Sequence, residues 1–156
     1  MQYNIIGGTF PVVTCTLADG ESMITEGGSM VWMTPNMEMS TTGGGIGKMF
    51  SKAVSGESFI MQKLTGNGIA FAEIDGDLVE YQLAAGQQMV VDTGNVAGFE
   101  ESVSIEAHMV KGAKNIFLGG EGMFNTVLTG PGRIWLQTMP ISSLAAAIAP
   151  MVSSGN

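Results

Sequence analysis

Apolar and polar residues alternate along most of this chain with a period of two. Between Val13 and Leu17 the apolar side chains occupy every second position and are separated by Thr14 and Thr16. This period places the apolar residues on one face of a β-strand that is buried on that face only. Short segments of this kind, separated by glycine-containing turns, continue to residue 139. The sequence therefore predicts an all-β protein.

The predicted strands are short and fall into two sets. The first set lies near residues 10–17, 21–25, 29–34, 36–42, 58–65 and 69–74. The second lies near residues 77–83, 87–92, 95–99, 102–110, 122–129 and 132–139. Between the strands stand pairs such as Asp19-Gly20 and Asn67-Gly68, which are typical of hairpin turns.

The two sets are two copies of one unit. When residues 56–71 are laid over residues 120–135, six of the 16 pairs are identical, whereas average composition would give about one or two. Residues 17–26 match residues 83–92 at a slightly larger spacing. An internal repeat determines architecture, because each unit forms one part of a stacked or paired core. We predict a single β domain over residues 1–150, built as a duplicated β-sandwich from pseudo-repeats at about 1–74 and 75–139.

Two segments have helical patterns. Residues 47–54 would form two turns with Met49, Phe50 and Ala53 facing inward. The run 142–149 follows Pro140, begins with a serine cap, contains strong helix formers and meets Pro150 as a stop. We expect this second segment to be a short C-terminal helix and residues 151–156 to be a frayed tail.

Charge excludes some classes of function. The 156 residues include 6 Lys and Arg against 14 Asp and Glu, which gives a net charge of −8. Such a surface repels phosphate backbones, so we expect no nucleic-acid partner. The N-terminus lacks the pattern of a secretory signal and no apolar run is long enough for a membrane-spanning helix. With a single cysteine in the chain, these features favour a cytoplasmic location.

The low proportion of charge predicts self-association. Charged residues make up 13% of the chain and apolar residues 45%, whereas about a quarter of an average domain is charged. We expect part of the apolar surface to be covered in a homo-oligomer, with a trimer or another ring ahead of a monomer. Met30, Met33, Met37 and Met39 crowd around Trp32 as candidate interface residues. The other interpretation, which we favour, is that these methionines are core residues of successive strands.

Residues that could take part in catalysis or metal binding are scattered along the chain. Cys15 lies on the apolar face of a strand and is expected to be a small buried hydrophobe. The single histidine, His108, cannot build a metal cluster. Glu100 and Glu101 are adjacent in sequence, so in a strand they point to opposite faces and are poorly placed to share a proton. We predict no catalytic residue, no metal site, no cofactor and no enzymatic activity.

Two further motifs have structural explanations. The glycine-rich stretch 42–49 resembles a phosphate-binding loop, but Thr42 and Met49 stand where that motif requires Gly and Ser or Thr. It is expected to be a connector. Glu57 and Glu121 precede equivalent strands in the two copies, and for them we favour capping of backbone amides over contact with a partner.

Segments spread over nearly the whole chain resemble the "altered inheritance of mitochondria 24" family. The resemblance is carried by residues 7–13, 17–22, 26–33, 59–66, 91–94, 117–122 and 129–138. It implies a fold similar to the trp RNA-binding attenuation protein, a β-sandwich repeat of shortened double-stranded β-helix type. Bacteria contain many members, and fungal members are proteins of the mitochondrial inner membrane. Relatives usually continue after residues 55–58 through another repeat, which this chain lacks.

The leading hypothesis is a non-enzymatic, oligomeric β-protein that acts as a scaffold or interaction module. A peripheral membrane or a second protein is a further partner consistent with this hypothesis. The alternative is a small-molecule binding module with its ligand between repeats or subunits, for which Trp32 and Trp135 are the candidate contact residues.

Overall fold

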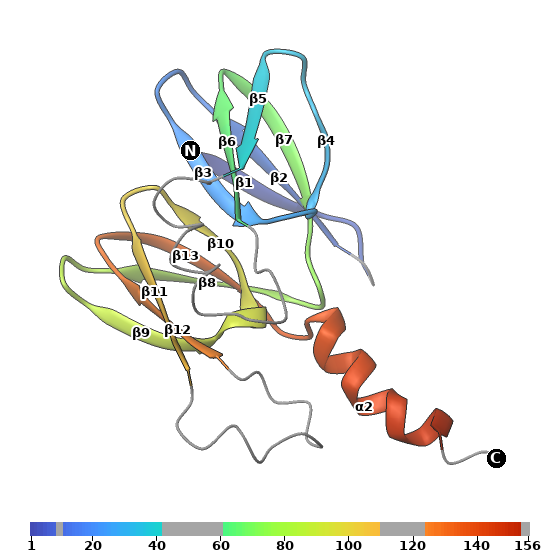
Figure 1. Cartoon of the computed structure of the whole chain (residues 1–156). Coiled ribbons are helices and arrows are strands. Elements are labelled where there is room, and N and C mark those ends of the chain that lie inside the picture. Colours follow the sequence, from blue (N-terminus) through green and yellow to red (C-terminus); the bar gives the residue numbers. More distant parts are fainter. Residues whose placement is uncertain (9–10, 42–60, 110–123, 154–156) are drawn as a thin grey trace.

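A computed structural model describes residues 1–8, 11–41, 61–109 and 124–153 (Figure 1). Within these residues it contains β-strands arranged in three antiparallel sheets and a single α-helix, α2 (Ile141–Ser153), at the C-terminal end. The predicted all-β class with a short C-terminal helix is confirmed.

The strands of the two repeats correspond one to one. The first repeat contains β2 (Val12–Leu17), β3 (Ser22–Glu26), β4 (Met30–Met33), β5 (Met37–Thr41), β6 (Met61–Gly66) and β7 (Gly68–Glu73). The second contains β8 (Leu78–Leu83), β9 (Gln88–Asp92), β10 (Val96–Glu100), β11 (Ser104–Met109), β12 (Phe124–Thr129) and β13 (Gly132–Gln137). A 3-10 turn, η1 (Thr93–Asn95), precedes β10. These bounds agree closely with the predicted strands.

The prediction missed one strand, β1 (Gln2–Ile6), which pairs with β2 at the edge of a sheet. Apart from the half-buried Tyr3, its residues are exposed. It therefore lacks the alternation of buried and exposed positions from which a strand is recognised.

Helix α2 (Ile141–Ser153) differs from the prediction at both ends. It continues through Pro150, whose fixed φ is compatible with a helix, although proline there removes a backbone donor and its ring crowds the carbonyl four residues earlier. Its first amide, that of Ile141, donates to the Asp75 carboxylate at 2.7 Å. The expected capping by Ser142 is therefore wrong, since the cap comes from a residue distant in sequence. The helix expected at 47–54 lies outside the described residues.

The two repeats use the same strand pairings. In the first repeat β7 lies between β2 and β4, while β6 lies between β3 and β5. In the second repeat β13 lies between β8 and β10, while β12 lies between β9 and β11. Even the irregularities recur, since β4 and β10 each carry a register shift, at Met30/Trp32 and at Val96/Gly98. The internal repeat read from the sequence is thus a repeat of structure.

One additional pairing joins the repeats. Strand β3 of the first repeat pairs with β10 of the second and extends two smaller sheets into one six-stranded sheet with the order β5-β6-β3-β10-β13-β8. The other two sheets of the described residues are the four-stranded sheet β1-β2-β7-β4 and the three-stranded sheet β11-β12-β9.

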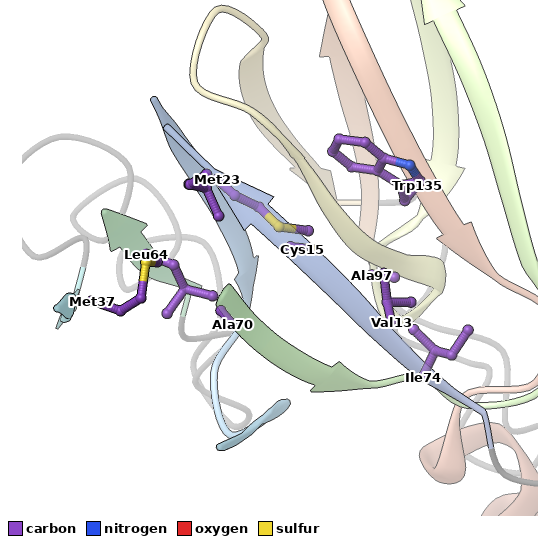
Figure 2. Close-up of a cluster of buried hydrophobic side chains, with 10 residues drawn as sticks. Val13, Cys15, Met23, Met37, Leu64, Ala70, Ile74, Ala97 and Trp135 are labelled. Atoms are coloured by element: carbon purple, nitrogen blue, oxygen red, sulfur yellow. The ribbon is translucent and has the colours of Figure 1, made fainter. Parts of the chain in front are cut away.

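The six-stranded sheet contributes to both hydrophobic cores. Adjacent residues of its strands point to opposite faces, and accordingly Met23 and Trp135 belong to one core while Ile24 and Ile134 belong to the other. Figure 2 shows the first core, in which Trp135 and Ala97 of the second repeat lie near side chains of the first repeat. Neither repeat encloses its core alone.

Candidate functional site at the junction of the repeats

The contact between β3 and β10 depends on a glycine. Gly98 pairs with Thr25 across the junction. A Cβ atom at Gly98 would lie 2.8 Å from the carbonyl oxygen of Ile24, which is closer than real Cβ atoms approach backbone atoms. The close approach of the strands therefore requires a residue without a side chain at position 98.

A half-buried arginine organises the polar side of this junction. Arg133 on β13 donates from Nε to Glu100 Oε1 at 2.8 Å, and a second guanidinium nitrogen lies 2.7 Å from the same oxygen. It also donates to the carbonyl oxygen of Met1 at 2.9 Å. Its own backbone amide donates to Glu100 Oε2 at 2.9 Å. Arg133 thus ties the N-terminal strand to the second repeat through charge-assisted hydrogen bonds.

Trp135 is enclosed by this network, with a side chain that is 2% exposed. The Tyr3 ring packs edge-on against it at 5.7 Å between ring centroids, and the Arg133 guanidinium lies 5.4 Å from its ring centroid. The indole Nε1 donates to Glu80 at 3.0 Å. Burial, together with Glu80, raises the pKa of Tyr3. The indole edge and donor are therefore engaged by the protein itself.

Two further carboxylates connect the repeats. Glu101 forms an ion pair with Lys63 of β6 and accepts a hydrogen bond from Ser22 of β3, and these contacts lower its pKa. Glu26 accepts from the Gln137 side chain at 3.1 Å, and its partial burial raises its pKa. Glu100 ends β10 and Glu101 lies in the turn that follows, and the two have separate cationic partners, Arg133 for the half-buried Glu100 and Lys63 for the exposed Glu101.

Trp32 has the opposite environment to Trp135. It lies on β4, the outer strand of the four-stranded sheet, and is 48% exposed. Its ring packs on Phe71 of β7 at 4.8 Å between centroids. The two tryptophans proposed as ligand contacts are not brought together in one site, and Trp32 is the accessible one.

The four candidate interface methionines occupy different environments. Met37 is buried in the first core, and Met30 and Met33 are partly buried against the same core. Met39 is exposed on β5, an outer strand of the six-stranded sheet. Met37 is therefore a core residue of this chain, whereas Met39 is accessible to a partner.

The remaining reactive side chains are Cys15 and His108. Burial raises the pKa of the Cys15 thiol to about 12, so it stays protonated. His108 is exposed on β11, with its Nε2 atom 3.6 Å from Glu106. In the described ranges, three His, Cys, Asp or Glu side chains do not come together in a metal-ligating group. The glycine-rich stretch, Glu57 and Glu121 lie outside those ranges.

The sequence interpretation did not identify helix α2 as a surface feature. Figure 1 shows the helix running away from the sheets toward the C-terminus. Its large apolar side chains are 42% to 76% exposed, namely Ile141, Leu144, Ile148, Met151 and Val152. The available signal was the spacing of these residues together with the absence of charge from the segment. Within the described residues, no helix has the length and apolar character needed to cross a membrane.

The network around Arg133 was also missed. A signal existed in the sequence, because Arg133 is one of only 6 basic residues and stands directly beside apolar strand residues. Its partners Met1 and Glu100 are distant in sequence, as are Tyr3 and Glu80, which contact the neighbouring Trp135, so only the fold identifies them.

A solved structure shares the fold. The crystal structure of protein SPYM3_0169 from Streptococcus pyogenes superposes with a TM-score of 0.52 at 19% identity, covering 96% of this chain and 99% of that chain. A search of curated proteins finds no match. The family model described as "Mitochondrial biogenesis AIM24" matches residues 3–61 and 51–139, which together span most of the sequence. The chain belongs to the AIM24 family.

Proposed function

We propose that this protein is a non-enzymatic β-scaffold that functions as a homo-oligomer. The observation that carries the proposal is the apolar surface of helix α2, because solvated monomers rarely expose contiguous apolar patches of this kind. Elsewhere on the molecule, Val31 and Trp32 on the outer strand β4 and Val90 on the outer strand β9 are further exposed apolar residues.

The polar side chains at the junction support a structural role. Arg133, Glu100 and Glu101 are bound to one another or to neighbouring residues across strands, and the protonated Cys15 thiol is a poor nucleophile. A cytoplasmic location and the absence of a nucleic-acid partner belong to the same proposal, on the basis of the single cysteine and the net charge of −8.

Light scattering coupled to size-exclusion chromatography tests the proposal directly. The chain has a mass of 16.2 kDa, so a homo-oligomer elutes with a multiple of that value. We expect a trimer or another closed assembly that dissociates on dilution. A mass that stays at one chain at concentrations of about 100 μM, well above a typical interface Kd, would refute it.

A second candidate function is binding of a small aromatic or apolar ligand. The exposed Trp32 ring, already packed on Phe71, supports this candidate, because aromatic surfaces stack readily with planar ligands. Thermal-shift screening with amino acids and nucleotides, combined with Trp32 fluorescence, tests it. Trp135 is the internal reference, since it is enclosed. A panel that neither stabilises the protein nor quenches Trp32 argues against a ligand.

A further inference from the structure

Helix α2 has the residue spacing of a coiled-coil seam. Ile141, Leu144, Ile148 and Met151 are separated by three, four and three residues, which is the spacing of alternating a and d positions in a heptad. The a positions hold isoleucine and the d positions hold leucine and methionine. In parallel coiled coils, β-branched residues at a with leucine at d favour two strands.

The remaining positions of the helix permit close approach of another helix. The segment Ile141–Ser153 contains no charged residue, although the whole chain carries a net charge of −8. Two copies therefore meet at this helix without like-charge repulsion between the helices. The positions beside the seam are small or apolar: Ala145 and Val152 follow the two d positions, and Ala147 precedes Ile148.

The body of the protein holds the start of the helix in place. The Ile141 amide is bound by Asp75, and the Ser143 and Leu144 amides donate to the carbonyl oxygen of the buried Pro140 at 3.0 and 3.1 Å. A helix of 13 residues is marginally stable alone in water. Anchoring at one end reduces the entropy lost on association, and apolar packing against a partner supplies the rest.

We propose that α2 is the self-association element of this protein and that its occupant is α2 of a second copy, packed in parallel through the a and d side chains. This inference rests on the proposed oligomeric function, names the surface responsible and, because the pair is two-stranded, makes a dimer the expected closed assembly. Lipid is the competing occupant, but α2 offers no Lys or Arg to anionic headgroups, which interfacial helices commonly use.

Single-cysteine variants test the seam and its direction. In a parallel pair each d residue faces the same residue of the other copy, so Leu144→Cys is expected to form a disulfide-linked dimer on mild oxidation. Ser143→Cys, one position away and outside the seam, is the matched control. The native Cys15 is buried and does not compete in the folded protein. If Leu144→Cys and Ser143→Cys cross-link equally, or if neither cross-links, the proposed parallel packing of the two helices is wrong.

Core truncation tests the energetic contribution without adding charge. The double variant Leu144→Ala/Ile148→Ala retains strong helix formers but removes two large side chains from the seam. We expect its dissociation constant for self-association to rise by about tenfold or more. Ser142→Ala/Ser143→Ala is the control and should leave the constant unchanged.

The outcomes separate this inference from the proposed function. A wild-type monomer refutes both. A wild-type oligomer whose mass and dissociation constant are unaffected by the double alanine variant refutes only the role of α2. A third outcome would assign the helix to a membrane surface instead. In that case the wild type is monomeric without lipid and floats with phosphatidylcholine vesicles, and Leu144→Ala/Ile148→Ala abolishes the flotation.

Discussion

Gly98 lies in the second repeat at the position that Trp32 occupies in the first. Gly98 pairs with Trp135 and Trp32 pairs with Phe71, and both pairs follow the same register shift. Beyond Gly98 lies β3, close enough to exclude a side chain. Beyond Trp32 no strand is paired in the described residues, since β4 is an outer strand. The glycine allows β3 to approach, and in the same geometry the Cβ atom of Trp32 would meet the backbone of an added strand.

Replacing Gly98 with alanine is expected to destabilise the junction. The new Cβ atom meets the Ile24 carbonyl at 2.8 Å, so β3 and β10 must move apart. Overpacking of this kind costs about 1 to 3 kcal/mol. Urea unfolding measures the change. Gly8→Ala is the control, because a Cβ atom there meets nothing within 4 Å. Equal stability of the two variants would contradict the role of Gly98.

Replacing Trp32 with glycine is expected to open β4 to strand addition. The equivalent of β3 in the second repeat is β9, whose outer edge is unpaired in the described residues and whose Val90 is 62% exposed. By analogy with the β3–β10 pair, β9 of one copy would pair with β4 of another and would do so head to tail. Dynamic light scattering should detect larger, concentration-dependent assemblies that the wild type does not form.

A second substitution distinguishes strand addition from unspecific aggregation. Adding Val90→Lys to Trp32→Gly places a charge on the complementary edge and should restore the wild-type size. Val79→Lys is the matched control, because Val79 is exposed on β8, an outer strand of a different sheet. If Val90→Lys and Val79→Lys both suppress the larger assemblies of Trp32→Gly, or if neither does, pairing between β9 and β4 is ruled out.

Arg133 is expected to be required for attachment of the N-terminal strand. Arg133→Ala removes the side-chain bonds to Glu100 and to the Met1 carbonyl, leaving a half-buried carboxylate without its cation, at a cost of about 2 to 3 kcal/mol. Arg133→Lys should recover little of this, since an ammonium group cannot reproduce the geometry of the guanidinium. Hydrogen exchange should accelerate in β1 before it accelerates in β12, which lies in another sheet.

Glu26 and Glu101 should have opposite effects on stability as pH changes. Burial, with a contribution from Asp75, raises the pKa of Glu26. The folded protein then binds its proton more tightly than the unfolded chain does, and stability falls as pH rises from the unfolded pKa through the folded one. Glu26→Gln should therefore raise the Tm at pH 7 by a few degrees and have little effect at pH 3.

Glu101 provides the comparison of opposite sign. Lys63 and Ser22 lower its pKa, so its contribution is present above the unfolded pKa and is lost as pH falls through the folded one. Glu101→Gln should lower the Tm at pH 7, by about 1 °C or less because the pair is exposed, and should match the wild type well below pH 3. Calorimetry across this range checks both variants. A loss of Tm at pH 7 in Glu26→Gln would contradict the buried-carboxylate explanation.

Local patterns were sufficient to predict most strands. Alternation at Val13, Cys15 and Leu17 identified β2, and the glycine-containing turn at Ala18–Gly20 marked its end. The same turn recurs at Ala84–Gly86, where Gln87 donates to the Ala84 carbonyl at 3.0 Å just as Glu21 donates to Ala18. Strand β1 and the passage of α2 through Pro150 were not predicted, because β1 depends on its neighbour β2 and because proline propensity alone does not decide a helix end.

The sequence by itself determined the strand periodicity, the turns and the duplication of the unit, because each is written in residues that are neighbours along the chain. Tertiary structure alone decided that β3 pairs with β10, that Trp135 is enclosed while Trp32 is exposed, and that Asp75 caps α2. These outcomes depend on which strand comes to lie beside which. Equivalent positions of the two repeats follow the same strand pattern but have different strands beside them. Gly98 and Trp32 therefore acquire their different roles only when the two repeats meet.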